Sequence, residues 1–412
     1  MESKQFIENV SGYGYDGEGV CRVNGKVVFV PYALRGEKIL GEIEDDRSSF
    51  CRGKLIEVKE GSKDRQVAPC PYFGECGGCA YQHTSYENEL TIKKELLINQ
   101  LKKVGYDGEV EVVPSPKVYG YRNKIRLFVG QDGLSLKKRA SGDLCGVERC
   151  LLVSDEMNNA IEIINSFIVA RKLNRIYKEV VLRQEGDKIA INFILSVKNS
   201  KVDYQGIYLR LGSNCGIFET FNGVCQHKIG LKSLESEEFG LKCSFTPNTF
   251  HQVNRFLTEK LYKKAIDSLA GDVIVNCYSG AGVLSGAVAV SGKRVIGIEL
   301  GESEHNDAQE LKERNSLFYL SNLKGDCAVV LPKISEKIDS IIVDPPRSGM
   351  DKRVIGTINS LNFKRLVYIS CNSATLVRDL GRLEGFKILS ISLFDMFART
   401  GEYEVVAVLE KY

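Results

Sequence analysis

The sequence predicts a multidomain α/β protein with a small N-terminal β-barrel, a central α+β domain and a C-terminal doubly wound α/β domain. Three observations predict this arrangement. Residues 1–60 read as short strands broken by glycine, residues 61–245 mix helical and strand patterns around a cysteine-rich loop, and residues 246–412 alternate helix and strand regularly. A length of 412 residues also suggests two or three domains.

The first 60 residues alternate apolar and polar positions, and Asn24-Gly25 provides a turn signal between two such runs. This pattern is typical of a small OB-like barrel, a fold that often binds RNA. A generic β-domain without a ligand is the alternative.

The central segment contains two helical patterns. Residues 85–104 have leucines at helical spacing, and residues 154–173 predict a helix capped by Ser154. Residues 121–130 and 188–197 read as strands.

Basic residues gather in the central segment, although the net charge of the whole chain is only +3. Residues 115–141 contain one acidic residue, Asp132, and seven basic residues: Lys117, Arg122, Lys124, Arg126, Lys137, Lys138 and Arg139. Such a patch can line a phosphate backbone, or it can be a solvated basic hairpin.

The C-terminal segment repeats helix and strand units. Strands are predicted at 272–278, 294–300, 338–346 and 365–371, with two more strands at 386–397 and 402–412; helices are predicted at 254–269, 302–315 and 373–383. Repeated βα units imply a parallel, doubly wound sheet that presents ligands at the carboxyl ends of its strands.

A nucleoside cofactor site is predicted at the first of these strands. Tyr278, Gly280 and Gly282 lie between a strand and a helix, and Glu299 ends the next strand, where an acid can accept hydrogen bonds from ribose hydroxyls. The third glycine of the dinucleotide fingerprint is replaced by Ser285, which favours S-adenosylmethionine over a nicotinamide dinucleotide.

Two further acids follow later strands of this segment. Asp326 stands where a third strand should end, so it either contacts the adenine or is a structural acid. Asp344 precedes two prolines that restrict φ and stiffen the loop, which would hold a carboxylate contact in place.

The chain has 13 cysteines and no apolar signal segment at its start, which argues against a disulfide scaffold. Cys70, Cys76 and Cys79 form a tight triplet in "CPYFGECGGC", with Cys150 as the candidate fourth ligand and Cys145 as its competitor. Zinc and a [4Fe–4S] cluster both accept four thiolates, and buried thiols without a metal are a third possibility. One triplet with a distant fourth cysteine favours the cluster.

Four motifs occur in order in the second half of the chain: "FTPNTFHQVN", "DPPRSG", "ISCNSATLVRD" and "DMFARTGEYE". Together they resemble the 5-methyluridine RNA methyltransferases, and the resemblance covers essentially the whole chain. It implies an N-terminal TRAM-like barrel, a [4Fe–4S] cluster and a Rossmann-like S-adenosylmethionine domain. The barrel and the cluster resemble the branch that modifies 23S ribosomal RNA, whereas the tRNA branch typically lacks both.

The chemistry of this reaction requires a nucleophile and a base. C5 of uracil is a weak nucleophile, but addition of a thiolate at C6 makes C5 electron-rich enough to accept a methyl group, after which a base must remove the C5 proton. Cys371 is our candidate nucleophile. The spacing of Glu402 and Glu404 would place both on one face of a strand, so only the resemblance favours Glu404 as the base.

The resemblance also implies which residues bind the RNA. Gln252 would hydrogen-bond the uracil edge and border the cofactor, Phe250 would pack on a uracil that has left its stack, and Asp344 would orient the uracil or the cofactor. We expect the basic residues Arg122, Lys124 and Arg126 to contact the RNA.

Three other readings of the sequence stay open at this point: a tRNA uridine methyltransferase, a non-catalytic iron–sulfur RNA-binding protein, and a flavin- or nicotinamide-dependent oxidoreductase. We expect a cytoplasmic protein that acts on RNA without a membrane segment or an obligate protein partner, because the longest apolar run, at 287–290, is far shorter than the ~20 residues of a bilayer span.

Overall fold

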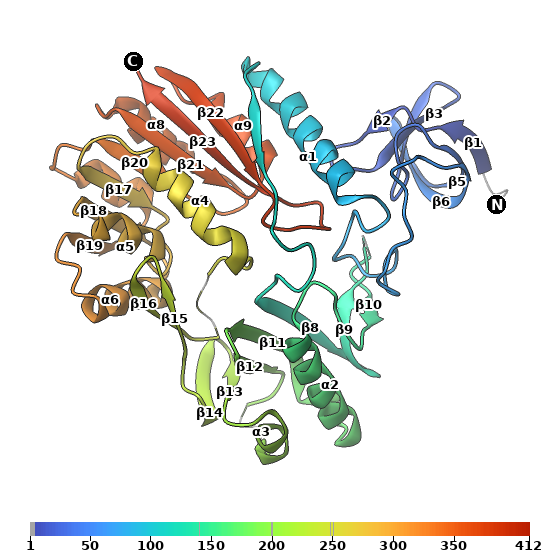
Figure 1. The fold of residues 1–412 in the computed structure, drawn as a ribbon, viewed down its shortest axis with the longest axis horizontal. Helices are drawn as coiled ribbons and strands as arrows, with labels where there is room; N and C mark the ends of the chain where they lie inside the picture. Colours follow the sequence, from blue (N-terminus) through green and yellow to red (C-terminus); the bar gives the residue numbers. More distant parts are fainter. Residues whose placement is uncertain (1–4, 140, 199–200, 248, 250) are drawn as a thin grey trace. The chain divides into compact units, whose positions relative to one another are not determined.

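The computed structural model describes residues 5–139, 141–198, 201–247, 249 and 251–412, and the chain forms two compact units (Figure 1). The first unit combines Met1–Asp107 with the short segments Lys137–Asp143 and Phe397–Tyr403. The second combines Gly108–Leu136, Leu144–Met396 and Glu404–Tyr412. Segments far apart in the sequence therefore share each unit.

A six-stranded sheet in the first unit contains the strands expected over residues 1–60, in the order β1-β5-β6-β4-β3-β2. The predicted turn is confirmed, because Asn24 and Gly25 have φ of 50° and 80° and join β3 to β4. Small and branched side chains such as Val28, Val30 and Ile39 form its core. The strands are β1 (Gln5–Asn9), β2 (Gly12–Tyr13), β3 (Gly19–Val23), β4 (Lys26–Val30), β5 (Lys38–Asp46) and β6 (Phe50–Glu60).

Helix α1 (Tyr86–Leu101) follows the cysteine-rich loop and begins at Ser85, whose Oγ accepts a hydrogen bond from the backbone N of Asn88. The helix buries an ion pair between Lys93 Nζ and Glu89 Oε1 at 2.8 Å, and Glu89 Oε1 also accepts from the backbone N of Arg399 at 2.7 Å. Arg399 Nη1 also forms a buried ion pair with Glu89 Oε2 at 3.4 Å. Since breaking a buried ion pair is costly, this pair holds the segment Phe397–Tyr403 in the first unit.

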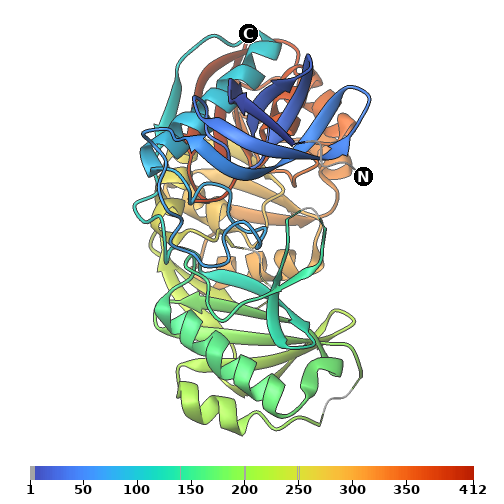
Figure 2. The ribbon, with the colours of Figure 1, turned by 90° about the vertical axis from the view of Figure 1, so that its right-hand side faces the viewer.

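A seven-stranded sheet in the second unit has the order β10-β9-β8-β11-β12-β13-β14. Helix α2 (Asp155–Ala170) is capped by Ser154 as predicted and lies across one face of this sheet, in green in Figure 2. Helix α3 (Gln205–Leu211) follows β12. The strands are β8 (Lys124–Gly130), β9 (Gly133–Lys137), β10 (Leu144–Gly146), β11 (Tyr177–Glu185), β12 (Lys188–Leu195), β13 (Cys215–Phe221) and β14 (Val224–Gly230). The hairpin of β15 (Leu234–Glu238) and β16 (Leu241–Phe245) comes next along the chain.

An eight-stranded sheet forms the rest of the second unit, in the order β19-β18-β17-β20-β21-β23-β22-β7. The first five strands are parallel, as predicted, but β23 runs antiparallel to both β21 and β22. The predicted parallel sheet is therefore mixed at this edge, because the last two strands form a hairpin. The strands are β7 (Val110–Val113), β17 (Val273–Cys277), β18 (Arg294–Glu299), β19 (Leu320–Lys324), β20 (Ser340–Val343), β21 (Arg365–Ser370), β22 (Phe386–Phe394) and β23 (Glu404–Lys411).

Helices connect the strands of this sheet. They are α4 (Arg255–Asp267), α5 (Val283–Val290), α6 (Glu302–Arg314), α7 (Cys327–Val330), α8 (Lys352–Ser360) and α9 (Ser373–Leu380). Across the described residues, no helix has both the length and the apolar character needed to cross a membrane.

Candidate active site at the carboxyl edge of the sheet

The carboxyl ends of the parallel strands bring most of the predicted catalytic and cofactor-binding residues to one edge of the eight-stranded sheet. Tyr278 follows β17, Glu299 ends β18, Asp344 follows β20 and Cys371 follows β21. Because β17, β18, β20 and β21 are parallel neighbours, these residues lie along the same edge. The antiparallel strand β23 begins at this edge, with Glu404 as its first residue.

Cys371 and Glu404 are next to each other across two strands. The last paired residues of β21 and β23 are Ser370 and Val405, so Cys371 and Glu404 extend that pair by one position. Glu404 is buried, at 5% exposure, and its charge acts on the Cys371 thiol. Glu402 precedes the strand and belongs to the first unit. The interpretation that both glutamates share one strand face was therefore wrong, because β23 starts at Glu404.

The turn after Cys371 is organised by its neighbours in the motif. Asn372 caps α9, since its Oδ1 accepts from the backbone N of Ala374 at 3.0 Å and of Thr375 at 3.3 Å. The Asn372 side chain also donates to the backbone O of Arg347 at 3.3 Å. The loop after β20 and the turn after β21 are thus tied together beside the thiol.

The Cys371 thiol is half-buried, and its surroundings favour the neutral form. Burial raises its pKa to about 11, and the nearby carboxylates of Glu404 and Asp344 add to the increase. The guanidinium of Arg347 acts in the opposite direction and lowers this pKa. The thiol therefore needs to lose a proton before it can act as a nucleophile.

Asp344, Gln252 and Tyr262 are close neighbours. Burial raises the pKa of Asp344 above its ordinary value. Tyr262 of α4 is buried at 8% exposure; burial raises its pKa, the charges of Asp344 and Glu404 add to the increase, and the nearby Gln252 side chain acts in the opposite direction. Gln252 is buried at 4%. Phe250, the predicted stacking residue, lies outside the described residues.

The glycine turn after β17 has the geometry that a nucleoside cofactor needs. Gly280 has φ of 54° and open space where a Cβ would stand, and its backbone N donates to Glu299 Oε2 at 2.9 Å. Gly282, at φ of 82°, lets α6 approach, because a Cβ there would lie 2.9 Å from the Cβ of Ala308. Glu299 Oε1 accepts from the backbone N of Gly301 at 2.7 Å. The carboxylate is therefore fixed beside the exposed backbone of the turn.

Asp326 has structural partners at the same edge. Its Oδ1 caps α7 by accepting from the backbone N of Ala328 at 2.9 Å, and its Oδ2 accepts from Arg353 Nη2 at 3.2 Å. Ser279 Oγ and Asn322 Oδ1, which both lie next to Gly297, are buried and have no hydrogen-bond partner within the part of the chain that the structure describes. Polar atoms of this kind beside the glycine turn fit a site that takes a polar cofactor.

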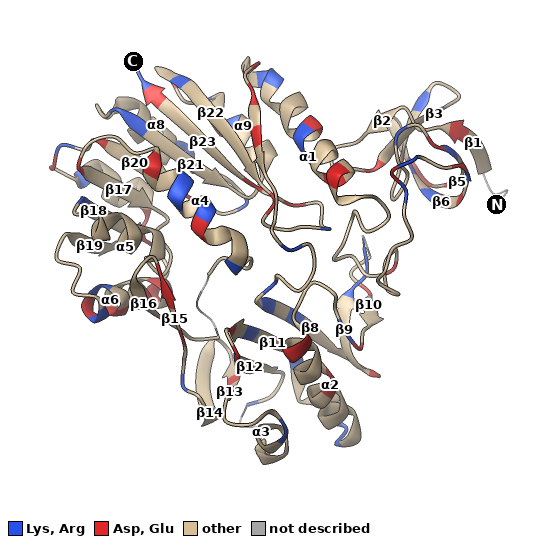
Figure 3. Ribbon diagram, in the orientation of Figure 1, with Lys and Arg blue, Asp and Glu red and all other residues tan. Residues whose placement is uncertain are grey.

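The basic residues predicted to contact RNA lie on or next to β8, where Figure 3 shows Lys and Arg in blue. Arg126 is exposed and forms an ion pair with Glu179 at 3.1 Å. Lys124 is partly buried, and burial together with Arg183 and Arg126 lowers its pKa to about 8. Arg122 precedes the strand and forms isolated bridges with Val153 and Asn254.

The predicted metal ligands are divided between the units. Cys70, Cys76 and Cys79 belong to the first unit and Cys150 to the second, and all four are partly exposed. Cys145 is buried on β10. Among the described side chains, no group of three or more His, Cys, Asp or Glu residues is arranged to hold a metal ion. The chemistry below uses no metal ion.

Two residues near the site were not identified from the sequence. Tyr262 reads as an ordinary apolar position on the face of a helix, so only its burial beside Asp344 marks it. Arg347 belongs to the motif "DPPRSG", but the sequence does not show that it lies close enough to Cys371 to lower the pKa of the thiol.

Comparison with known proteins finds relatives that are RNA methyltransferases. The family model described as tRNA (uracil-5-)-methyltransferase matches residues 331–412, which include Cys371 and Glu404. An uncharacterized RNA methyltransferase of Caldanaerobacter subterraneus subsp. tengcongensis is 30% identical over 443 residues, covering 98% of both chains. The 23S rRNA (uracil(1939)-C(5))-methyltransferase RlmD of Francisella tularensis subsp. novicida is 29% identical, covering 98% of this chain and 97% of the relative.

A solved structure resembles the whole chain. The crystal structure of the Pyrococcus abyssi tRNA (uracil-54, C5)-methyltransferase in complex with S-adenosyl-L-homocysteine is 26% identical, with a TM-score of 0.82, and the match covers 98% of this chain and 100% of that one. With a full-length relative at 30% identity, a family match over the site and this neighbour, the chain belongs to the S-adenosylmethionine-dependent RNA uracil-C5 methyltransferases.

Proposed function

We propose that this enzyme methylates C5 of a uridine in 23S ribosomal RNA, with Cys371 as the nucleophile and Glu404 as the base. The observation that carries the proposal is the adjacency of Cys371 and Glu404 at the carboxyl edge of the sheet, where β21 ends and β23 begins. A covalent mechanism needs a thiol and a carboxylate on the same uracil ring.

The reaction proceeds in steps that these two residues can perform. Cys371, as a thiolate, adds to C6, and the electron pair of the C5–C6 bond becomes available at C5. C5 then forms a bond to the methyl group that S-adenosylmethionine, when bound, would supply, and the cofactor would leave as S-adenosylhomocysteine. Glu404 then accepts the C5 proton, the C5–C6 double bond re-forms and the Cys371 sulfur leaves C6. The RNA gains a methyl group, and the thiolate is regenerated.

Other residues of the edge would hold the two reactants. Gln252 and Asp344 would hydrogen-bond the polar edge of a uracil that has left its stack, and Phe250 is the proposed stacking partner. Since the pKa of Asp344 is raised by burial, its protonated form can also donate a hydrogen bond to a uracil oxygen. The cofactor would lie along Tyr278, Gly280 and Gly282, with Glu299 on its ribose and Asp326 near its base; their residue types support this.

The choice of 23S ribosomal RNA is supported by full-length relatives with that activity in their names, at 29% identity. The second candidate is uridine 54 of tRNA, because the solved structure with a TM-score of 0.82 is a tRNA (uracil-54, C5)-methyltransferase. The six-stranded sheet of residues 5–60, which we propose to be a TRAM-like barrel, and the basic residues Arg122, Lys124 and Arg126 would contact the RNA backbone.

A [4Fe–4S] cluster is a further part of the proposal. The tight triplet Cys70, Cys76 and Cys79 supports it, together with the backbone N of Gly78, which donates to Cys76 Sγ at 3.4 Å as amides commonly do to cluster sulfurs. Cys150 is the proposed fourth ligand. Its role would be structural or RNA-positioning, since none of the reaction steps above needs an electron.

One experiment tests the substrate. The purified enzyme is incubated with S-adenosylmethionine labelled in its methyl group and with either 23S ribosomal RNA or tRNA transcribed without modifications. Labelled 5-methyluridine in the ribosomal RNA alone supports the proposal, and label in the tRNA alone favours the second candidate. The absence of 5-methyluridine from the same RNA of a deletion strain confirms the assignment in the cell.

A further inference from the structure

Thr249 and the stretch 251–254, which carries Gln252, are held by side chains of the seven-stranded sheet, among them a buried arginine. Arg183 on β11 is only 1% exposed, and its Nη1 donates to the backbone O of Thr249 at 2.5 Å. Its Nη2 lies 3.6 Å from Glu185 Oε1, and its guanidinium lies 4.5 Å from the ring centroid of Phe245. A buried charge-assisted hydrogen bond to a backbone carbonyl is among the stronger contacts that can hold a segment in place.

Other bonds hold the same segment from the same sheet. The side-chain N of Asn123 donates to the backbone O of Gln252 at 3.3 Å and to Glu185 Oε1 at 3.2 Å. The backbone N of Asn123 donates to the O of Val253 at 2.9 Å. Thus three carbonyls of the segment, those of residues 249, 252 and 253, accept bonds from β11 or from the residue that precedes β8.

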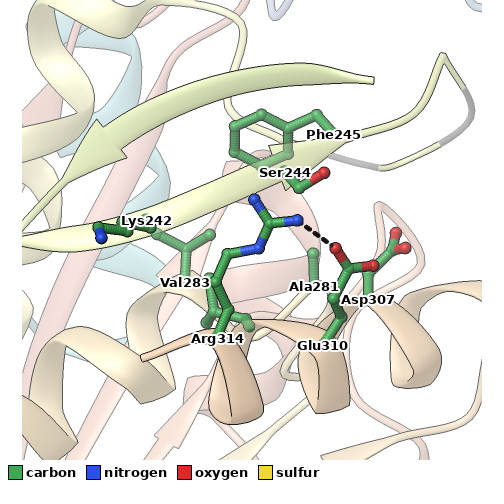
Figure 4. A pocket seen from close by; sticks show the side chains of 9 residues that line it. Lys242, Ser244, Phe245, Ala281, Val283, Asp307, Glu310 and Arg314 are labelled. Carbon is green, nitrogen blue, oxygen red and sulfur yellow. Dashed lines mark hydrogen bonds and ion pairs between the residues drawn. The ribbon is translucent and has the colours of Figure 1, made fainter. Parts of the chain in front are cut away.

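Thr249 is also bonded to helix α6, which connects two strands of the eight-stranded sheet. Thr249 is fully buried, and its Oγ1 donates to Asp307 Oδ2 of α6 at 2.8 Å. Figure 4 shows Asp307 and Phe245 on facing elements around a small cavity of ≈ 10 Å³, room for about one water. His251 is also held, with its Nε2 at 2.9 Å from Glu238 Oε2.

Arg183 is also a neighbour of the proposed RNA-binding residues. It pairs directly with Lys124 in the register of β11 and β8, and Val181 pairs with Arg126. Their side chains therefore project from the same face of the sheet. Arg183 therefore lies next to these cations in the sheet, while its guanidinium donates to the carbonyl of Thr249.

We propose that Arg183 is a positioning residue, which holds Thr249 and thereby the nearby stretch 251–254 so that Gln252 meets the uracil. Arg183 would also link this stretch to the strand that binds the RNA backbone. This inference rests on the proposed function of Gln252 and Cys371. It assigns Arg183 no contact with the uracil and no part in binding S-adenosylmethionine.

The experiment measures adduct formation and cofactor binding separately, with Arg183→Gln and with Lys178→Gln as the matched control. Lys178 is an exposed cation on the same strand. Each purified full-length variant is mixed with RNA containing 5-fluorouridine and S-adenosylmethionine, and the rate of covalent trapping is followed on a denaturing gel. The affinity for S-adenosylmethionine is measured by calorimetry on the same samples.

We expect Arg183→Gln to trap the RNA about ten- to a hundredfold more slowly, while the affinity for S-adenosylmethionine stays within about twofold of the wild-type value. Lys178→Gln should trap at the wild-type rate, and Arg183→Lys, which keeps the charge, should recover part of the loss. Trapping by Arg183→Gln at the wild-type rate, or an equal loss of cofactor binding and adduct formation, would overturn the positioning role.

A second variant covers the case in which Arg183→Gln does not fold. Asn123→Ser removes the side-chain bonds to the Gln252 carbonyl and to Glu185 Oε1 but keeps the backbone bond to Val253. It should slow trapping in the same direction with cofactor affinity unchanged; normal trapping by a folded Asn123→Ser enzyme would count against the anchoring role. A wild-type enzyme that never traps the RNA would overturn the proposed function together with this inference, whereas trapping by wild type and by Arg183→Gln alike overturns the inference alone.

Discussion

Cys371 and Glu404 occupy adjacent strand ends at one edge of the eight-stranded sheet, one position beyond the pair formed by Ser370 and Val405. The two residues come from strands that run in opposite directions, so the end of β21 and the start of β23 coincide. A nucleophile and a base on one uracil ring require this proximity, and the antiparallel hairpin of β22 and β23 provides it.

Replacement of Cys371 by Ala should abolish the covalent adduct with 5-fluorouridine RNA, because no other group of the proposed mechanism attacks C6. Methyl transfer to uridine RNA should fall below detection. Denaturing gels of the trapped complex provide the measurement, and Cys225→Ala, which removes another partly exposed thiol, is the control. An adduct that survives in Cys371→Ala would remove this residue from the mechanism.

Replacement of Glu404 by Gln should allow the adduct to form and then to accumulate on ordinary uridine RNA, since the C5 proton can no longer be removed. The amount of protein–RNA complex that resists denaturation measures this effect. Glu402→Gln is the comparison, because Glu402 lies before the start of β23. If Glu402→Gln accumulates the adduct and Glu404→Gln does not, the roles assigned to the two glutamates are reversed.

Alkylation of Cys371 in the enzyme without RNA should be slow at pH 7 and rise about tenfold per pH unit between pH 7 and 9, because burial raises the thiol pKa to about 11 and only the thiolate reacts. Iodoacetamide labelling, resolved by mass spectrometry of the peptide, measures the rate at this cysteine.

The neighbours of the thiol should shift this profile in opposite directions. Arg347→Gln removes a cation that lowers the Cys371 pKa, so alkylation at pH 8 should become slower; Glu404→Gln removes an anion that raises it, so alkylation should become faster. A flat profile from pH 7 to 9 would contradict the protonated thiol.

Replacement of Gly282 by Ala should lower the free energy of unfolding by roughly 1–3 kcal/mol, because its φ of 82° disfavours a side chain and the new Cβ would lie 2.9 Å from that of Ala308. Gly292→Ala is the control, since Gly292 has φ of 84° with open space around it. It should lose only the backbone contribution, about 1 kcal/mol. Equal losses in urea unfolding would show that the contact with α6 is unimportant.

Iron and acid-labile sulfide should each be present at about four per chain in enzyme purified without oxygen, as a [4Fe–4S] cluster requires. Cys76→Ser should lose the iron, whereas Cys225→Ser should retain it. Stoichiometric zinc with no iron, measured by plasma emission spectroscopy, would replace the cluster with a zinc site.

Local patterns were sufficient where the determining interactions lie within a few residues. The Asn24-Gly25 turn, the Ser154 cap of α2 and the glycine turn after β17 could all be predicted, since each depends on backbone preferences and on bonds between near neighbours. The succession of helices and strands after residue 254 follows from periodicity in the same way.

The sequence by itself predicted most of the helices and strands, the sheet edge at which a nucleoside cofactor is expected, and the reaction class that its motifs resemble. Only the tertiary structure decided which residues meet. In the structure β23 starts at Glu404 rather than Glu402, and it runs antiparallel to the strands beside it. The Arg183 side chain donates to the carbonyl of Thr249, 66 positions away in the sequence. These outcomes depend on strand pairing and on side-chain burial between distant segments, which local propensity and spacing do not specify.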